Sequence, residues 1–552
     1  GSGAGATTSM YYDADGRQVA TRDANGNVNG ATYAALGHVT AEIHADGGVV
    51  RYTYDALGEK TSMTDALGNK TLYGYDEVGR LVMTEQASNV QVWRYFGNGN
   101  ATQLEGSGPL IERIAYDQRG NKISTTDANY QTTRYTYDLR GDVISTTDPD
   151  GNVTRDAYDA EGHKVAEVDA NHNAQTWRYD YFGQTLSHTD IGGAQYFYTY
   201  DNARQLTQQS NTRGMNQTFS YDVAGHVTQI TDNALGQVTQ YSYDAAGNRI
   251  REVTMQNGVV YQDNHLAYDA LNRLRRVEDG NVSIVYDYDA NGNRTHINTQ
   301  YENVSGGGVG QDQYFTYDAM NRETAADLDK YGDITQSQGH RMTYDLNGNR
   351  ISDTSIGAVM DSSGKKTLGT VVQTYAYDSL NRLVMTKYNG TVIDQRQYDA
   401  DGRVVLSGLG SGVSQSFYDT LGLSDQVQFN LYDGAGRLLF QRNYNANGQE
   451  QDNVSYTSYD AVGNVLQYRV NSVQGTAYTN TYTNTLVRYS GYEVATQSGT
   501  STVLQPGQTN YQYDVNGNLV GVTDSTNGAN NRSFVNDVNG QILQKTQGSA
   551  VE

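Results

Sequence analysis

Apolar and polar positions alternate with a period of two over short stretches of this chain, and turn-forming residues separate the stretches. Aromatic residues carry the clearest part of the pattern, because a Tyr recurs with a second aromatic residue two positions before it, as at Tyr52 and Tyr54. Residues two apart share one face of an extended strand. The pattern therefore predicts strands with two rings on one face. No helical period is long enough to predict a helix.

The same aromatic spacing recurs through the chain, and it predicts ladders of rings when the repeats stack side by side. Both Trp residues follow the spacing, since Trp93 precedes Tyr95 and Trp177 precedes Tyr179. We interpret both as part of the ladder. Further pairs are Tyr73 and Tyr75, Tyr135 and Tyr137, Tyr198 and Tyr200, Phe219 and Tyr221, Tyr241 and Tyr243, Phe315 and Tyr317, Tyr375 and Tyr377, and Tyr511 and Tyr513.

A Tyr-Asp dipeptide returns every 21 residues without a slip from Tyr116 to Asp222. A period this strict indicates an array of identical structural units. Within a unit, Tyr54-Asp55 is followed by Gly58, and a second turn signal begins at Asp65. Two turns per unit leave room for two strands of roughly six residues each, so the whole chain is predicted to form about 45 strands.

Asp opens each predicted turn, because its side chain accepts a hydrogen bond from the backbone two residues later. Gly closes the turn in a left-handed conformation, and Asn272, Asn321 and Asn381 replace Gly in later units. The residues that we predict to define the repeat are Tyr54, Asp55, Gly58, Tyr75, Asp76, Gly79, Tyr116, Asp117, Gly120, Tyr137, Asp138, Gly141, Tyr158, Asp159, Gly162, Tyr221, Asp222 and Gly225.

The period loosens after Tyr243 and the motif is lost between residues 471 and 510. We accordingly predict five segments. Residues 1–10 are a linker or an expression scar, and residues 11–250 are regular repeats. Residues 251–470 are degenerate repeats with loop insertions, residues 471–510 a polar insertion or irregular hairpin, and residues 511–552 the last repeats.

Composition restricts the kind of core that the repeats form. The 552 residues include 46 Tyr, 60 Gly, 3 Pro and no Cys, and the net charge is −23. Burial must therefore come largely from aromatic faces with polar tips. The acidic balance argues against nucleic acid as a partner, and the absence of a long apolar run argues against membrane insertion.

Tyr-Asp-x-x-Gly-Arg-Leu, as at residues 75–81, resembles the RHS repeat, also called the YD repeat. The resemblance covers nearly the whole chain, and it implies an all-β fold in which a long antiparallel strip of hairpins spirals into a hollow shell. Related arrays occur in Tc toxin C subunits, bacterial polymorphic toxins, wall-associated proteins and teneurins. A β-propeller or a β-solenoid is the alternative fold.

The family resemblance implies a secreted or cell-surface protein. In the toxins the shell encloses a C-terminal toxic polypeptide, so a toxin passenger or neighbouring domains of a longer protein are the expected partners. The alternative is an adhesion or carbohydrate-binding array with a cell-surface glycan as partner. The toxins' self-cleavage segment has no match in this sequence, so autoproteolysis is not assigned.

No enzyme, cofactor or zinc site is predicted, because the carboxylates recur in every unit and no His-x-x-x-His pair has an acidic partner. His38, His163 and His226 each follow a turn Gly and are interpreted as turn-flanking residues. The one candidate metal site is for calcium, at Asp287, Asp289 and Asn291, where the sequence fits the first positions of an EF-hand loop but lacks its final Glu.

Overall fold

The computed structural model contains strands and turns, with no helix among the residues that it describes. These are 6–86, 94–96, 100–102, 110–191, 193–301, 310–328, 339–360, 366–408, 427–433, 435–444, 450–459, 465–471, 477–483, 493–499, 508–513, 519–524, 531–536, 542–547 and 550–551. One antiparallel sheet holds 45 strands, and β9 (Arg94–Phe96) and β10 (Asn100–Thr102) form a separate pair. The predicted all-β antiparallel strip is confirmed. The four-stranded blades of a propeller are not seen in this sheet.

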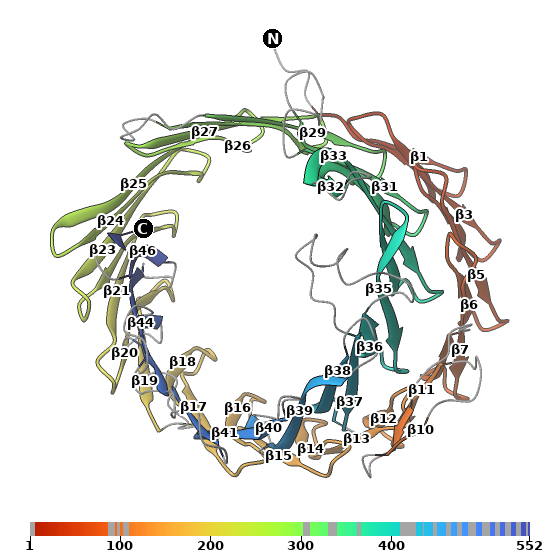
Figure 1. Cartoon of the computed structure of the whole chain (residues 1–552), viewed down its shortest axis with the longest axis horizontal. Coiled ribbons are helices and arrows are strands. Elements are labelled where there is room, and N and C mark those ends of the chain that lie inside the picture. Colours follow the sequence, from red (N-terminus) through yellow and green to blue (C-terminus); the bar gives the residue numbers. More distant parts are fainter. Residues whose placement is uncertain are drawn as a thin grey trace. The chain divides into compact units, whose positions relative to one another are not determined.

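The strands fall into two compact units, and Figure 1 colours the strands by their position along the chain. Unit 1 comprises residues 1–133, 284–301 and 305–451, and unit 2 comprises residues 134–283, 302–304 and 452–552. Strands that follow one another in sequence pair antiparallel, as β5 does with β6 and β6 with β7. Where β9 and β10 intervene, β8 pairs with β11 instead.

Unit 1 contains two rows of hairpins. The first row comprises β1 (Ser9–Tyr12), β2 (Gln18–Arg22), β3 (Val28–Tyr33), β4 (Val39–Ile43), β5 (Val49–Tyr54), β6 (Lys60–Thr64), β7 (Lys70–Tyr75), β8 (Leu81–Gln86), β11 (Leu110–Tyr116) and β12 (Lys122–Thr126). The second row comprises β27 (Val282–Tyr288), β28 (Arg294–Tyr301), β29 (Gln311–Tyr317), β30 (Glu323–Leu328), β31 (His340–Tyr344), β32 (Arg350–Met360), β33 (Lys366–Tyr377), β34 (Leu383–Tyr388), β35 (Thr391–Tyr398), β36 (Val404–Gly408), β37 (Val427–Tyr432) and β38 (Leu438–Tyr444).

Unit 2 is built from the same kind of hairpin. Its earlier strands are β13 (Thr132–Tyr137), β14 (Val143–Thr147), β15 (Val153–Tyr158), β16 (Lys164–Val168), β17 (Ala174–Tyr179), β18 (Thr185–Thr189), β19 (Gln195–Tyr200), β20 (Leu206–Asn211), β21 (Asn216–Tyr221), β22 (Val227–Asp232), β23 (Gln237–Tyr243), β24 (Arg249–Gln256), β25 (Val259–Tyr268) and β26 (Leu274–Glu278). Its later strands are β39 (Glu450–Tyr459), β40 (Val465–Asn471), β41 (Ala477–Thr483), β42 (Glu493–Gly499), β43 (Gln508–Tyr513), β44 (Leu519–Asp524), β45 (Arg532–Asn536), β46 (Ile542–Gln547) and β47 (Ala550–Val551).

Each regular repeat has a Tyr-Asp turn and, about ten residues later, a second turn that we call the short turn. In the Tyr-Asp turn at residues 55–58, the carboxylate oxygen Oδ1 of Asp55 accepts the backbone N–H groups of Leu57 and Glu59, both at 2.9 Å. Gly58 closes the turn with φ of 83°. Asn272, Asn321 and Asn381 replace it elsewhere with φ of 59–60°, as the sequence predicts.

The repeat Tyr ties each hairpin to the one before it. The hydroxyl of Tyr54 donates a hydrogen bond to the backbone carbonyl of Val39 at 2.9 Å, 15 residues earlier. Tyr158, Tyr179, Tyr200 and Tyr221 repeat this bond with the same separation. The Tyr therefore contributes a fixed hydrogen bond as well as aromatic surface.

Replacing Tyr200 with Phe should lower stability by about 1 kcal/mol, because the carbonyl of Thr185 loses its hydroxyl donor at 2.9 Å while the ring is kept. Tyr198→Phe is the matched control, since Tyr198 lies on the same strand and its ring faces the same side. Urea unfolding monitored by circular dichroism measures the difference. Equal midpoints for the two variants would contradict a role for the hydroxyl bond.

The ring ladders differ from the prediction, because Arg and His side chains alternate with the Tyr rings. The residue after the turn Gly stacks on the repeat Tyr of the next unit, as His38 does on Tyr54 with centroids 4.8 Å apart. The Arg17 guanidinium takes the same place over Tyr33. Trp177 stacks on His188, and His188 stacks on Tyr196. Trp93 lies outside the described residues. Other side chains that follow a turn Gly or Asn and stack on the next repeat Tyr are His163 on Tyr179, His226 on Tyr243, Arg80 on Tyr116 and Arg322 on Tyr344.

Turn glycines are required for two separable reasons. Gly162 and Gly183 both have positive φ, of 93° and 81°. A Cβ at Gly162 would meet no atom within 4 Å, whereas a Cβ at Gly183 would lie 2.8 Å from Nε2 of His163. Gly162→Ala should therefore cost about 1–2 kcal/mol from backbone strain alone.

Gly183→Ala should cost a further ~1 kcal/mol, because the stacked His163 ring must move. The thermal midpoints of both variants, compared in the wild-type and His163→Ala backgrounds, measure the two contributions. The excess cost at Gly183 should disappear in the His163→Ala background, and its persistence would show that the clash is not its source.

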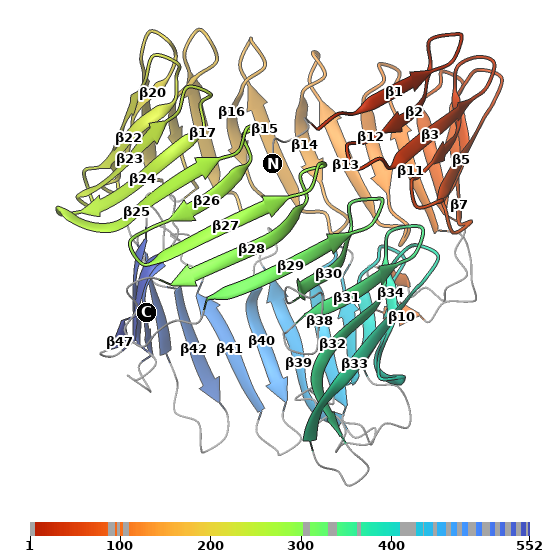
Figure 2. The same ribbon diagram turned by 90° about the horizontal axis from the view of Figure 1, so that it is seen from above.

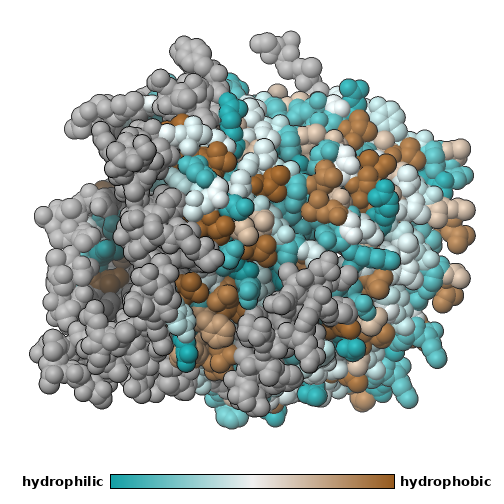
Figure 3. Space-filling model, turned by 45° about the vertical axis from the view of Figure 1, so that its right-hand side comes forward, coloured by the Kyte–Doolittle hydropathy of each residue, from teal (hydrophilic) through white to brown (hydrophobic). Residues whose placement is uncertain are grey.

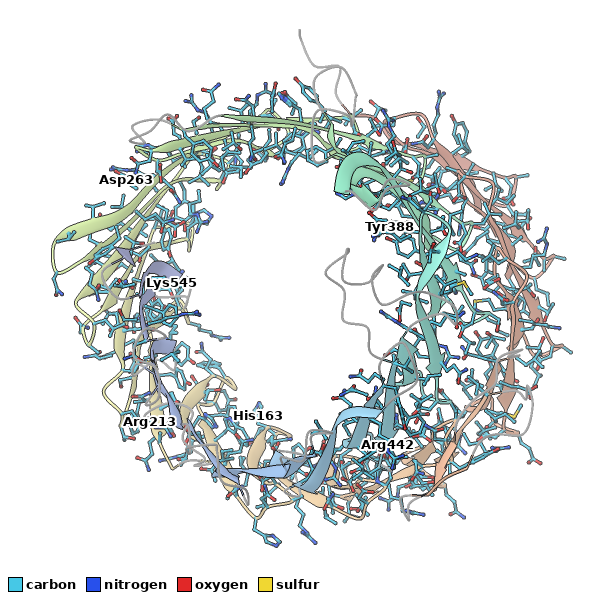
Figure 4. All side chains as sticks on the ribbon, viewed as in Figure 1. His163, Arg213, Asp263, Tyr388, Arg442 and Lys545 are labelled. Atoms are coloured by element: carbon cyan, nitrogen blue, oxygen red, sulfur yellow. The ribbon has the colours of Figure 1, made fainter. Side chains whose placement is uncertain are left out.

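Little apolar core exists in the described part of the chain. Side chains project from both faces of the strands (Figure 4), and one small apolar cluster is fully buried, at Leu110, Ala128 and Ala400. Most strand residues are half-buried, in keeping with a single-layer sheet. Among the described residues, no helix is long and apolar enough to span a membrane.

Candidate functional site: the junction between two rows of turns

The short turns of the first row meet the Tyr-Asp turns of the second row within unit 1. Figure 2 shows these rows one beside the other, with β3 to β7 next to β31 to β34. Four short turns contact four Tyr-Asp turns in order along the two rows. We call this line of contacts the junction. Residues 23–26, 44–47, 65–68 and 127–130 contact residues 289–292, 318–322, 345–348 and 399–403, respectively.

Hydrogen bonds between polar side chains fasten the first contact. The backbone N–H of Asn25 donates to Oδ1 of Asn291 at 3.0 Å, and the Asn25 amide donates to Oδ2 of Asp289 at 2.9 Å. The Asn291 amide donates to Oδ2 of Asp23 at 2.7 Å. Each turn therefore supplies both donors and acceptors, which sets the register of one row against the other.

An ion pair stabilises the second contact, and a hydrogen bond from a side-chain amide stabilises the third. Nη2 of Arg322 lies 2.9 Å from Oδ2 of Asp46, and the two side chains are 21% and 13% exposed. The Asn347 amide donates to Oδ2 of Asp65 at 2.7 Å. Between these contacts lies an open hollow of about 340 Å³, lined by Val50, Asp46, Asp65, Met320, Arg322 and Asn347 among others.

The fourth contact brings two carboxyl groups together. The Asn129 amide donates to Oδ2 of Asp401 at 2.5 Å, and Asn129 is only 1% exposed. Burial raises the pKa of Asp127 and of Asp401, and the neighbouring charge of Asp127 raises the pKa of Asp401 further. Arg403 lies 3.3 Å from Asp401, which offsets part of this repulsion. The carboxyl groups of Asp127 and Asp401 together therefore retain a proton at a higher pH than an ordinary carboxyl group does.

The predicted calcium residues divide between two different contacts. Asp287 lies beside His296, with Oδ2 2.9 Å from Nδ1 of the ring. Asp289 and Asn291 lie at the first junction contact, where the amides of Asn25 and Asn293 donate to Asp289 and the Asn291 amide donates to Asp23. In the described part of the chain no three acidic, His or Cys side chains converge as a metal-ligand set. Calcium binding by these residues stays a prediction.

His296 is a second notable group near these residues. Its Nε2 lies 2.5 Å from Oδ1 of Asp312, and its ring stacks on Tyr314 with centroids 4.2 Å apart. Burial lowers the pKa of His296, but the hydrogen bonds to Asp287 and Asp312 outweigh burial, and the net effect is a raised pKa. The charged form of the ring is thus stabilised between two carboxylates.

The residues that define the repeat occupy turns throughout both units, so no single site collects them. Sequence reasoning did not anticipate the junction. A partial signal lies in the third residue of the Tyr-Asp turn, which in the second row is polar or acidic at Asn291, Asn347 and Asp401 but apolar at Met320 and Leu380. The first row has Leu36, Leu57 and Val78 at this position in three successive repeats, and Asp15 and Arg119 in two others.

A family model described as RHS Repeat matches residues 33–69, 116–153, 137–174 and 221–260. These segments begin at or next to the Tyr-Asp motif and contain the Asp-to-Gly turns described above. The chain therefore contains RHS repeats. The matched segments lie in both units, and RHS hairpins of the same construction extend between them.

Two relatives of the RHS chain are named as nucleases. The tRNA3(Ser)-specific nuclease WapA of Bacillus spizizenii is 30% identical over 221 residues, which cover 36% of this chain and 8% of that protein. The tRNA nuclease WapA of Bacillus subtilis is 31% identical over 172 residues, which cover 30% of this chain and 6% of that protein. The RHS chain thus matches less than a tenth of the length of either relative.

Solved structures of Tc toxins are also similar to the RHS chain. The crystal structure of TcdB2-TccC3 aligns with a TM-score of 0.45 and 15% identity, over 98% of this chain and 33% of that chain. The Tc holotoxin pore of Photorhabdus luminescens aligns with a TM-score of 0.42 and 15% identity, over 98% and 32% of the two chains.

Proposed function

We propose that this RHS chain is a non-catalytic wall that encloses a C-terminal toxin polypeptide of a secreted bacterial toxin. The observation that carries the proposal is the junction, where rows of hairpins fasten edge to edge through four successive side-chain contacts in unit 1. Sheets that add rows in this way become broad surfaces rather than compact cores. Two relatives whose names are those of nucleases support a link to toxins.

The chemistry of the chain suits a wall with solvent on both sides. Its side chains project from both faces of the sheet, and its net charge is −23. An acidic wall attracts a cationic or partly unfolded passenger weakly, and it disfavours nucleic acid as a partner. The proposal includes a location outside the producing cell, no membrane insertion and no cofactor.

Protease protection tests the enclosure. In the complete gene product that contains these 552 residues, the polypeptide that follows the RHS repeats should resist trypsin at least about tenfold longer than the same polypeptide expressed alone. Weakening the junction with Asp46→Ala should shorten the protection. Digestion of the downstream polypeptide at the same rate with and without the RHS chain would refute enclosure.

A second candidate function is carbohydrate binding, which one exposed aromatic pair favours. Tyr181 and Phe182 occupy the tip of a Tyr-Asp turn in unit 2 and are 93% and 60% exposed. Their rings meet edge to face at 5.4 Å, and the Arg204 guanidinium lies over the Phe182 ring at 4.0 Å. A flat ring held in place in this way suits stacking on a sugar.

A glycan array distinguishes this candidate from a pure wall. If the chain acts as an adhesin, it should bind particular glycans, and Tyr181→Ala should abolish the binding. Leu139→Ala is the matched control, because Leu139 lies at another turn tip of unit 2 and is 86% exposed. Absence of glycan binding, or binding that survives Tyr181→Ala, would count against carbohydrate recognition at this tip.

A further inference from the structure

The third residue of five successive Tyr-Asp turns in the second row lies at the junction. Asn291, Asn347 and Asp401 each bond to a short turn of the first row. Leu380 packs on the buried cluster that contains Ala128 of a short turn, and Met320 lines the hollow. This position of the turn is thus the one through which a row contacts its neighbour.

In three successive repeats of the first row the same position is exposed and apolar, whereas Asp15 and Arg119 occupy it in two other turns of that row. Leu36 is 78% exposed, Leu57 is 82% exposed and Val78 is 73% exposed, and these residues belong to three successive repeats. A single exposed Leu is ordinary on a protein surface, but a repeated row of apolar tips along one edge marks an interaction site. Figure 3 views the side of the molecule that contains unit 1, where hydrophobic residues lie in small groups among hydrophilic ones.

Arg80 of the first row and Arg322 of the second row make the same contacts within their rows. Nε of each lies 2.7 Å from the Asp that opens its own turn. Nη1 of each donates to the carbonyl of the next Tyr-Asp turn, at 3.0 and 3.2 Å. Each guanidinium also lies over the next repeat Tyr. The difference is that Arg322 reaches a carboxylate of the neighbouring row, Asp46, and Arg80 has no such partner among the described residues.

We propose that the edge formed by Leu36, Leu57, Val78 and Arg80 docks a further row of RHS hairpins from another stretch of the same gene product. The docked row presents its short turns to this edge, with a small residue against each apolar tip and a carboxylate opposite Arg80. The proposal concerns how RHS rows assemble, and it stands whether or not a passenger is enclosed.

The residues expected in the docked row, which is the occupant of this edge, can be inferred from the junction that unit 1 already contains. The second residue of all four short turns there is Ala, at Ala24, Ala45, Ala66 and Ala128. The two rows approach closely, since a Cβ at Gly48 would lie 3.2 Å from the carbonyl oxygen of Leu346. These four short turns already contact the second row, so a second copy of unit 1 cannot offer them. The occupant in the proposal is a different stretch of repeats, and the labelling experiment distinguishes it from unit 2 of a second copy, which has short turns of its own.

Thiol labelling tests the docking, because this chain has no Cys and each introduced thiol is unique within it. Leu57→Cys and Val78→Cys are compared with Val259→Cys, which is 58% exposed in the wild type and lies outside any Tyr-Asp turn. Maleimide labelling of each thiol is followed by peptide mass spectrometry in the 552-residue chain and in the complete gene product.

All three thiols should label at similar rates in the 552-residue chain. In the complete gene product, labelling at residues 57 and 78 should slow at least about tenfold, while labelling at residue 259 should not change. Unchanged labelling at residues 57 and 78 would overturn the proposal.

A second copy as the occupant is the competing outcome, and the chain alone reveals it. Protection at residue 57 that rises with the concentration of the 552-residue chain, together with dimers by mass photometry, would overturn the proposal in favour of self-association. Arg80→Glu supplies a further check, since it should restore fast labelling at residue 57 in the complete gene product, whereas Arg51→Glu, at an exposed position on β5 outside any turn, should not.

Discussion

Leu110→Ala should lower the stability of unit 1 by about 2–4 kcal/mol, the largest loss that we expect from a single truncation in this chain. Leu110 is 5% exposed and packs with Ala128 of a short turn and Ala400 of a Tyr-Asp turn. The side chain thus joins both rows at the junction. Shortening it removes apolar surface from each row at once and leaves a cavity between turns that polar bonds hold in place.

Hydrogen exchange measures this loss locally, because a repeat protein need not unfold in one step. Amides of β12 and β36 should exchange faster in Leu110→Ala than in the wild type, while amides of unit 2 should change little. Leu139→Ala is the control, because Leu139 is 86% exposed and its loss should cost less than about 0.5 kcal/mol. Equal effects of the two substitutions would show that the cluster does not hold the junction.

Local features of the fold are predictable because each is encoded within about twenty residues. Asp55 and Gly58 determine a turn through bonds that span four residues, and the sequence shows both residue types in every regular unit. The replacement of Gly by Asn272 is equally predictable from the sequence, since both residue types tolerate positive φ. The alternation of Tyr52 and Tyr54 likewise predicts which face of the strand carries the rings.

The stacking of His38 on Tyr54 spans 16 residues and crosses from one repeat to the next. It could have been inferred from the residue types that follow the turn Gly, because Arg and His both stack on aromatic faces. The prediction considered ring against ring and missed this alternation. The finding gives these turn-flanking His residues a packing role.

The junction could not have been predicted from the sequence alone. Asn25 bonds to Asn291 and Asp65 bonds to Asn347 across separations of 266 and 282 residues. The repeat period drifts after Tyr243, so the register of the second row against the first cannot be counted from the spacing. Which row a turn faces depends on how the strip curves, and no single repeat contains that information.

The junction also explains why acidic residues in similar turns respond to pH in opposite ways. Asp76 opens an exposed turn, where the backbone N–H of Arg80 lowers the pKa of its carboxyl group. Stability from this turn is therefore present above the unfolded pKa and is lost as pH falls. At the fourth junction contact, burial raises the pKa of Asp127, Asp399 and Asp401. Stability there is present below the unfolded pKa of about 3.9 and is lost as pH rises through the folded pKa.

Asp401→Asn should stabilise unit 1 relative to the wild type at neutral pH, by on the order of 1–3 kcal/mol, because it removes a buried like charge without removing volume. The introduced side chain retains a carbonyl oxygen that can accept the hydrogen bond of the Asn129 amide. The groups that face the pair are Asp127, Asp399, Arg403 and Asn129, with Arg382 bonded to the carbonyl of Asp399.

The pH profile distinguishes this cause from a general gain in packing. The difference in thermal midpoint between Asp401→Asn and the wild type should be small near pH 4 and should grow as pH rises towards 8, because only then does the wild-type pair carry two charges. Asp76→Asn is the control, and its effect on the thermal midpoint should have the opposite sign. Its midpoint should lie below that of the wild type at neutral pH, and this difference should shrink as pH falls below about 5, because the wild-type carboxylate then takes up a proton. A stabilisation of Asp401→Asn that is equal at every pH would show that the carboxyl pair does not share a proton at the junction.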